Sequence, residues 1–195
     1  MKPPEQKRTA PVSQPRPLAP RLTGEARTRR AEAEQWMLQA TDTPHTAAME
    51  WTTHQVALLT AGRVWDAVRL PYVLLRPDFE RETRPEELRR RVAELQVEGA
   101  MFCDPYRPFL YVLVPPGTDR RWPDDMAPAG VECMGGTAPY IRHVGVPRLD
   151  LLAPPGLFWL VPPDSGGRRL ADAQHLYEVL RACAPELSRP TPRTP

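Results

Sequence analysis

Three stretches of the chain carry apolar residues three or four positions apart, the spacing of one helix face. The first covers residues 25–40 with Thr23 as its expected N-cap, a shorter one follows Thr43 and Pro44, and the last covers residues 172–184. The predicted inward positions are Ala33, Trp36, Met37 and Ala40 in the first, Ala47, Ala48 and Trp51 in the second, and Leu176, Val179, Leu180 and Cys183 in the last. Each stretch is expected to pack one face against a core.

The segment TRPEELRRRVAELQVEG, residues 83–99, predicts a fourth helix. Thr83 and Glu86 have the spacing of a capping box, and Pro85 suits the first turn. Gly99 is the expected end of the helix. The apolar stripe consists of Leu88, Val92 and Leu95.

Short apolar runs between turn residues or prolines predict strands. Residues 55–59 and 63–70 flank a turn at Gly62, and residues 100–104 and 109–114 flank the turn PYRP, which predicts an antiparallel hairpin. Further strands are expected at 130–134, 139–146 and 157–161. Strands outnumber helices and are joined by hairpins as well as by one helix. The predicted class is therefore α+β, with a mixed or antiparallel central sheet and packing helices.

Proline-rich segments bound the predicted core at both ends. Residues 1–22 contain six prolines and no hydrophobic periodicity, so they bury too little apolar surface to offset the loss of chain entropy. We expect a disordered basic arm at 1–22, a single α+β domain at 23–184, and a disordered tail at 185–195. A chain of 195 residues is within the usual size of one domain.

The charge of the chain is concentrated at its beginning. Residues 1–30 contain eight basic and two acidic side chains, a net charge of +6, whereas the rest contains 18 basic and 22 acidic side chains, a net charge of −4. A nucleic-acid contact is therefore expected only near the arm, because phosphate contacts need basic groups. The candidate residues are Lys7, Arg8, Arg27, Arg29 and Arg30. The alternative is a solvated tail whose arginines reflect GC-rich codons.

Most sequence motifs that identify an active site or a cofactor-binding site are missing. The sequence has no P-loop, GxGxxG, HExxH or GxSxG motif, and none of its four histidines has a His or Cys partner for a metal at i+3 or i+4. Three cysteines without CxxC spacing suggest neither a disulfide framework nor a zinc site. We expect no cofactor and no bound metal. A Cys-His nucleophile pair, with His143 near Cys103 or Cys133, would have to form in space.

No apolar run suits a signal peptide or a membrane span, and the unpaired cysteines suit a reducing compartment. We therefore expect a cytoplasmic protein that does not associate with membranes.

The order of four segments resembles that of a known family. These are GRVWDAVRLP followed by the predicted helix, then FCDPYRPFLYVLVPPG, GVECMGGTAPYIRHVGVP and PGLFWLVPP. Over about residues 50–184 they resemble the bifunctional DNA primase/polymerase (prim-pol) domain, in the degenerate form found in actinobacteria. The resemblance implies a prim-pol-like α+β fold. Active domains of this family hold metal ions with two acids one residue apart on a strand, a phosphate-contacting histidine beyond the next hairpin, and a third acid later.

The matching positions here carry different chemistry. The acidic pair falls at Arg69 and Pro71, the histidine falls near Phe109, and only Glu132 offers an acid at the third place. A cation at the metal position would repel the ions of a two-metal reaction. The resemblance therefore implies a scaffold without nucleotidyl transfer.

Asp66 is the remaining acid near the expected pair, and valines occupy positions 64 and 68. If Asp66 faces the core it needs a partner, since burying it unpaired would cost several kcal/mol. If it lies at a sheet edge it is solvated, and this second reading is the one we expect. The weak catalytic candidates are Asp66, Glu132 and His143.

Three functions remain open at this stage. The first is a non-catalytic prim-pol-like binding module, associated with DNA or with a replication or transfer protein through its basic arm. The second is a protein-interaction or regulatory accessory without nucleic-acid binding, since proline-rich segments are pre-ordered ligands for aromatic grooves. The third is an enzyme with residual nucleotide or metal chemistry at the three candidate residues.

Overall fold

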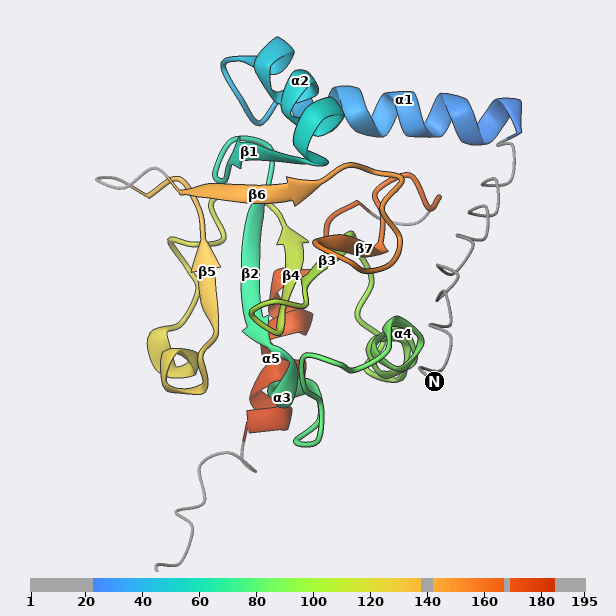
Figure 1. The fold of residues 1–195 in the computed structure, drawn as a ribbon. Helices are drawn as coiled ribbons and strands as arrows, with labels where there is room; N and C mark the ends of the chain where they lie inside the picture. Colours follow the sequence, from blue (N-terminus) through green and yellow to red (C-terminus); the bar gives the residue numbers. More distant parts are fainter. Residues whose placement is uncertain (1–22, 138–141, 167–168, 185–195) are drawn as a thin grey trace, which may run out of the picture.

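Antiparallel strands with helices on both sides make up the computed structural model, which describes residues 23–137, 142–166 and 169–184 (Figure 1). The predicted arm at 1–22 and the predicted tail at 185–195 lie outside the described residues. The predicted α+β class is confirmed.

Four of the helices lie where the apolar spacing predicted them. In chain order the helices are α1 (Gly24–Leu38), α2 (Pro44–His54), α3 (Tyr72–Leu75), α4 (Pro85–Glu94), the 3-10 helix η1 (Asp124–Ala129) and α5 (Ala173–Cys183), and the four predicted ones are α1, α2, α4 and α5. Thr23 caps α1 by accepting a hydrogen bond from the Ala26 N–H, as expected. The short helices α3 and η1 had no prediction, because one or two turns are too short to show a periodicity.

The strands are β1 (Val56–Thr60), β2 (Asp66–Pro71), β3 (Met101–Asp104), β4 (Phe109–Val114), β5 (Glu132–Met134), β6 (His143–Pro147) and β7 (Phe158–Val161). Five of them form one antiparallel sheet in the order β5-β2-β4-β3-β7, and β1 and β6 form a separate pair. The predicted hairpin is confirmed as β3 and β4, with Cys103 opposite Leu110. The strands on either side of Gly62, β1 and β2, enter different sheets.

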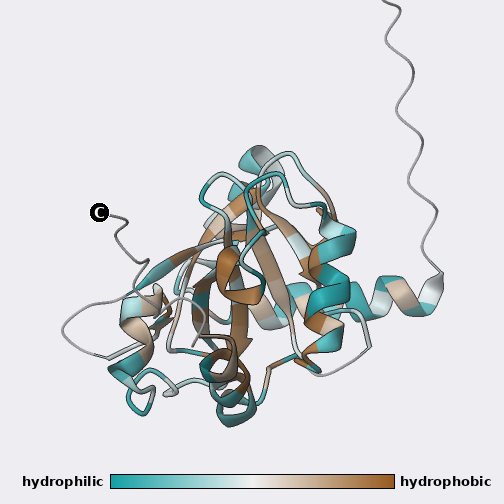
Figure 2. Ribbon diagram, turned by 90° about the horizontal axis from the view of Figure 1, so that it is seen from below, coloured by the Kyte–Doolittle hydropathy of each residue, from teal (hydrophilic) through white to brown (hydrophobic). Residues whose placement is uncertain are grey.

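The five-stranded sheet separates two cores. On one face, Val68, Leu70 and Val112 pack against α3, α4 and α5. On the other face, Ala67 and Leu113 pack against α1, α2 and the β1-β6 pair. This alternation follows from the two-residue period of a strand, which turns neighbouring side chains to opposite faces. Figure 2 shows the apolar strands inside and hydrophilic residues on the outer surfaces of the helices.

The predicted capping box of α4 is wrong. The N-cap is Arg84 rather than Thr83, and the Thr83 hydroxyl instead accepts a hydrogen bond from the Glu80 N–H. The helix also ends at Glu94, well before Gly99. The Thr83 side chain closes the turn that leads into the helix and therefore does not cap it. Of the predicted start signals, only Pro85 lies in the first turn as expected.

None of the helices in the described residues combines the length and the apolar composition that crossing a bilayer requires.

Candidate functional site

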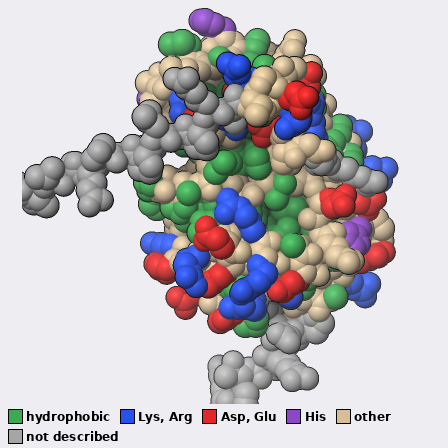
Figure 3. Space-filling model, turned by 90° about the vertical axis from the view of Figure 1, so that its right-hand side faces the viewer, with side chains coloured by type: hydrophobic (Ala, Val, Ile, Leu, Met, Phe, Trp, Pro, Cys, Tyr) green, Lys and Arg blue, Asp and Glu red, His purple; other side chains and the backbone are tan. Residues whose placement is uncertain are grey.

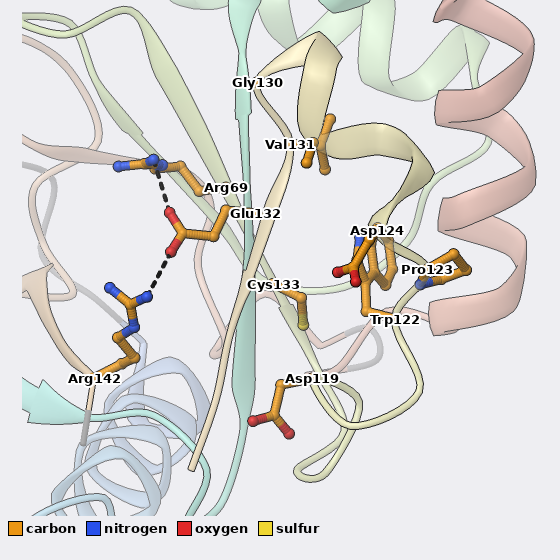
Figure 4. A pocket seen from close by; sticks show the side chains of 11 residues that line it. Arg69, Asp119, Trp122, Pro123, Asp124, Gly130, Val131, Glu132, Cys133 and Arg142 are labelled. Atoms are coloured by element: carbon orange, nitrogen blue, oxygen red, sulfur yellow. Dashed lines mark ion pairs between the residues drawn. The ribbon is translucent and has the colours of Figure 1, made fainter. Parts of the chain in front are cut away.

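A pocket of about 420 Å³ lies beside β5, the strand at one edge of the large sheet (Figures 1 and 4). Strand β2 carries Arg69 to it, the segment after β4 carries Asp119 and Trp122, and Arg142 precedes β6. The remaining lining residues are Pro123, Asp124, Ala127, Gly130, Val131, Glu132 and Cys133. The pocket therefore contains Arg69 and Glu132, two of the four positions that the resemblance singled out.

Glu132 is held between two arginines. Arg69 and Glu132 are directly opposite each other on β2 and β5, with 2.8 Å between Nη2 and Oε2. Arg142 approaches the other carboxylate oxygen, with 3.2 Å between Nη2 and Oε1 (Figure 4). The Arg69 guanidinium also lies 4.6 Å from the centre of the Phe109 ring. Both oxygens of this carboxylate are therefore committed to cations that the chain itself supplies.

This cluster lies where the resemblance places metal ligands. The described residues contain no group of three or more His, Cys, Asp or Glu side chains that could hold a metal ion. Two guanidinium groups beside the single carboxylate add positive charge, which opposes the binding of a divalent cation. The arrangement can close an ion-pair cluster, but it cannot supply the ligands of a two-metal reaction.

The expectation that Asp66 is solvated at a sheet edge is wrong. Asp66 is fully buried and lies in β2, between β5 and β4 in the sheet order. Its Oδ2 accepts a hydrogen bond of 2.9 Å from the backbone N–H of Asp119, and the two carboxyl groups are close enough to influence each other's pKa. The sequence did not reveal this partner, because Asp119 is 53 residues further along the chain.

Burial raises the pKa of Asp66 to about 6, and the neighbouring Asp119 carboxylate adds to the increase. The pKa of Asp119 shifts in the opposite direction. Although partial burial acts to raise its pKa, hydrogen bonds from the Thr137 hydroxyl and N–H lower it below the usual value. Below a pH of about 6 the proton of this pair therefore resides on Asp66, while Asp119 is the more acidic group of the two.

The three catalytic candidates do not form a common site. Asp66 shares its face of the sheet with Val68, whereas Glu132, opposite Arg69, shares the other face. His143 is exposed on β6, in the other sheet. Neighbouring side chains of a strand point to opposite faces of the sheet. Asp66 and Arg69 are three positions apart on β2, so Asp66 lies on one face and the Arg69–Glu132 pair lies on the other.

The cysteines are not activated as nucleophiles either. Burial raises the pKa of the Cys133 thiol, and the nearby Asp66 and Asp119 carboxyl groups raise it further. Burial likewise raises the pKa of Cys103 to about 12. Both thiols therefore stay protonated at neutral pH, which is the opposite of what a Cys-His pair requires.

Trp122 separates the β5 pocket from a second pocket of about 430 Å³. Its ring meets the Tyr177 ring edge to face, with centroids 5.8 Å apart, and the Tyr177 hydroxyl donates to Asp125. Neither Trp122 nor Asp119 nor Arg142 was predicted from the sequence. The one available signal was the cluster of charged and aromatic residues after β4, TDRRWPDD, which has no motif spacing.

The basic candidates divide between the arm and α1. Lys7 and Arg8 lie outside the described residues. Arg27 and Arg29 are exposed on α1, whereas the Arg30 Nε is paired with Asp164 Oδ2 at 2.9 Å and is therefore not available to a phosphate.

The domain surface mixes charges of both signs. Figure 3 shows basic and acidic side chains interleaved on the face that carries α4. Pairs such as Arg84 with Glu87 and Arg91 with Glu94 account for this pattern. That face therefore lacks the uninterrupted basic surface typical of duplex-binding domains.

Comparison of the chain with known proteins found no matching family model, no matching curated protein and no matching solved structure.

Proposed function

We propose that this chain is a non-catalytic binding module with a prim-pol-like scaffold, acting in the cytoplasm on a partner that docks at the β5 pocket. The observation that carries the proposal is the ion-pair cluster of Arg69, Glu132 and Arg142. The resemblance would match two of these residues, Arg69 and Glu132, to the metal-binding acids of an active domain. The family assignment itself rests on the resemblance of segment order.

Two further carboxyl groups near the pocket, those of Asp66 and Asp119, support the same view. Asp66 is fully buried, and its Oδ2 accepts from the Asp119 backbone. Asp119 Oδ2 accepts from Thr137. Each of these two carboxyl groups therefore has one oxygen occupied by the chain itself, and a cation that took that oxygen would displace a hydrogen bond worth about 1.5–3 kcal/mol.

The purified full-length chain tests this proposal directly. We expect no incorporation of nucleotides into a primed template, and no heat of binding when Mn²⁺ or Mg²⁺ is titrated into the protein by calorimetry. Thermal stability should stay unchanged when nucleotide and Mn²⁺ are added together. Primer extension that is lost in Glu132→Gln but retained in Glu178→Gln, a variant on α5, would refute the proposal.

Association with DNA is a second candidate, favoured by α1. This helix extends beyond the sheet (Figure 1), carries the exposed Arg27 and Arg29, and directly follows the basic arm. We expect weak DNA binding that decreases as the salt concentration rises. Replacing both arginines by alanine should reduce the salt dependence of the binding constant by the equivalent of about two phosphate contacts. The matched control replaces Arg84 and Arg90 on α4. Equal loss in both double variants, or no binding at 20 mM salt, would remove this candidate.

A further inference from the structure

We propose that the outer edge of β5 is a docking site for an extended peptide segment of a partner protein, which adds to the large sheet as a further strand. The inference specifies the partner of the binding module proposed above and rests on that proposal only in assigning the pocket to binding instead of catalysis.

The first observation is that other strand edges are covered by the chain itself. The Arg89 side chain donates to the Leu160 carbonyl of β7 and to the Leu152 carbonyl beside it, at 3.1 and 2.8 Å. On β1, the Leu58 N–H donates to Glu50 Oε2. The Thr60 N–H of the same strand donates to the Ala40 carbonyl. Such covering is how folded proteins prevent unwanted strand pairing.

The edge of β5 differs from these. The backbone of β5 (Glu132–Met134) forms its hydrogen bonds with β2. Within residues 23–137, 142–166 and 169–184, no side chain and no other backbone group forms a hydrogen bond with the main chain of these three residues. An antiparallel strand directs every second pair of N–H and C=O groups away from its neighbour. As far as the described residues go, β5 therefore presents unpaired main-chain groups at the end of the sheet order.

The second observation is that the pocket follows this same edge. Four consecutive residues, Gly130 to Cys133, line it, and the other lining residues lie on both sides of the strand (Figure 4). Glu132 and Cys133 are only half-buried. A cavity beside an unpaired edge has the shape that an added strand requires, with main-chain pairing along the edge and side chains directed to the two sides.

The third observation is that the two sides of the pocket have opposite charge. One side has Arg142, whose side chain is 53% exposed, in addition to the Arg69–Glu132 pair. The other side has the Asp124 carboxyl group beside the Trp122 ring, and the Asp119 carboxyl group further along the pocket (Figure 4). Neighbouring residues of a strand point to opposite sides. The fitting partner therefore has an acidic residue next to a basic one: the acid pairs with Arg142, and the base pairs with Asp124 and lies over Trp122.

Titration of the ¹⁵N-labelled full-length chain with a peptide tests this inference. The probe is acetyl-Thr-Val-Glu-Arg-Val-Thr-amide, and the control is acetyl-Thr-Glu-Val-Arg-Val-Thr-amide, which has the same composition but places both charges on one side. We expect saturable shifts of the amide signals of residues 131–134 with the probe, and binding at least five-fold weaker with the control. Absence of shifts at these amides with millimolar probe would overturn the inference.

Variants of the protein test the charges. Arg142→Glu is expected to weaken binding of the probe at least five-fold, whereas Arg90→Glu, a charge reversal at an exposed arginine on α4, is expected to leave it unchanged. A well-dispersed amide spectrum of both variants shows that each is folded. Equal affinity of both variants would overturn the assignment of the acidic residue to Arg142.

N-methylated probes test the main-chain pairing. Methylation of alternate amides should abolish binding in one of the two alternating series and spare it in the other, because only every second N–H of an added strand faces β5. Unchanged binding in both series would overturn strand addition. A chain that binds the probe but extends primers would refute only the proposed non-catalytic function, and a chain that does neither would refute only this inference.

Discussion

Asp66 and Asp119 form a carboxyl pair in which the Asp119 backbone N–H donates to Asp66 Oδ2 at 2.9 Å. Asp66 is fully buried in β2, and Thr137 holds Asp119 from the segment after β5. The pair therefore ties three segments together at the wall of the β5 pocket. Below a pH of about 6, the proton on Asp66 keeps two negative charges from opposing each other.

Stability should fall as the pH rises through the titration of Asp66. Its pKa is raised to about 6 in the folded chain, above the usual value of 3.8, so the folded state binds more protons than the unfolded state between these values. The contribution of Asp66 is thus largest below pH 4 and decreases by up to about 3 kcal/mol towards pH 6, above which it stays constant. Urea unfolding at pH values between 4 and 8 measures this change, after comparison with Asp66→Asn to remove the effect of other groups.

Asp66→Asn should stabilise the chain at pH 8, because the amide stays uncharged where the carboxyl group would be ionised. We expect a gain of about 1–3 kcal/mol at pH 8 and a small effect at pH 4, measured by urea unfolding. Asp66→Ala is the control: it leaves the Asp119 N–H without its acceptor and should destabilise the chain by about 1–3 kcal/mol. A loss of stability at pH 8 in Asp66→Asn would contradict the raised pKa of Asp66.

Gly135→Ala should disturb the same pair from the other side. A Cβ on Gly135 would overlap the Asp119 carboxyl group, so that group must move away from Thr137 and Asp66. We expect a destabilisation of about 1–3 kcal/mol by urea unfolding at pH 5. Gly24→Ala is the matched control, because nothing lies within 4 Å of a Cβ there. Equal effects of the two substitutions would argue against the close packing of Gly135 on Asp119.

The aromatic cluster under the β1-β6 pair should be a large source of stability. The Phe102 ring stacks on the Tyr111 ring at 4.7 Å and meets the Trp159 ring edge to face at 5.3 Å. Phe102 and Trp159 are both fully buried. Phe102→Ala is expected to cost about 3–5 kcal/mol in urea unfolding. Tyr106→Ala, at a side chain that is 61% exposed, should change stability by less than about 0.5 kcal/mol.

Glu132→Gln tests the ion-pair cluster. The substitution leaves the Arg69 guanidinium over Phe109 but removes the charge that both arginines share. Because these side chains are partly exposed, we expect a loss of only about 0.5–1 kcal/mol in unfolding free energy, decreasing at high salt. A loss above about 3 kcal/mol would show that the cluster is effectively buried.

Local patterns were sufficient for the elements whose structure depends on near neighbours. Thr23 caps α1, Asp172 accepts from the His175 N–H at the start of α5, and the PYRP turn joins β3 to β4. Each of these features is decided within a few residues, by capping or by the limited conformations of proline. The start of α4 was not predicted correctly, because the Thr83 hydroxyl could accept a hydrogen bond either from the first turn of the helix or from the Glu80 N–H before it, and it accepts from Glu80.

The sequence by itself determined the α+β class, the apolar faces of the helices and the absence of an acidic pair one residue apart at positions 69 and 71. Only the tertiary structure decided which face each charged residue occupies and which distant residue it meets. In the folded chain Asp66 contacts Asp119, and Glu132 forms ion pairs with Arg69 and Arg142. The physical reason is that strand pairing brings together segments tens of residues apart, and the energy of a charged group depends on that partner and on its burial more than on its neighbours in the chain.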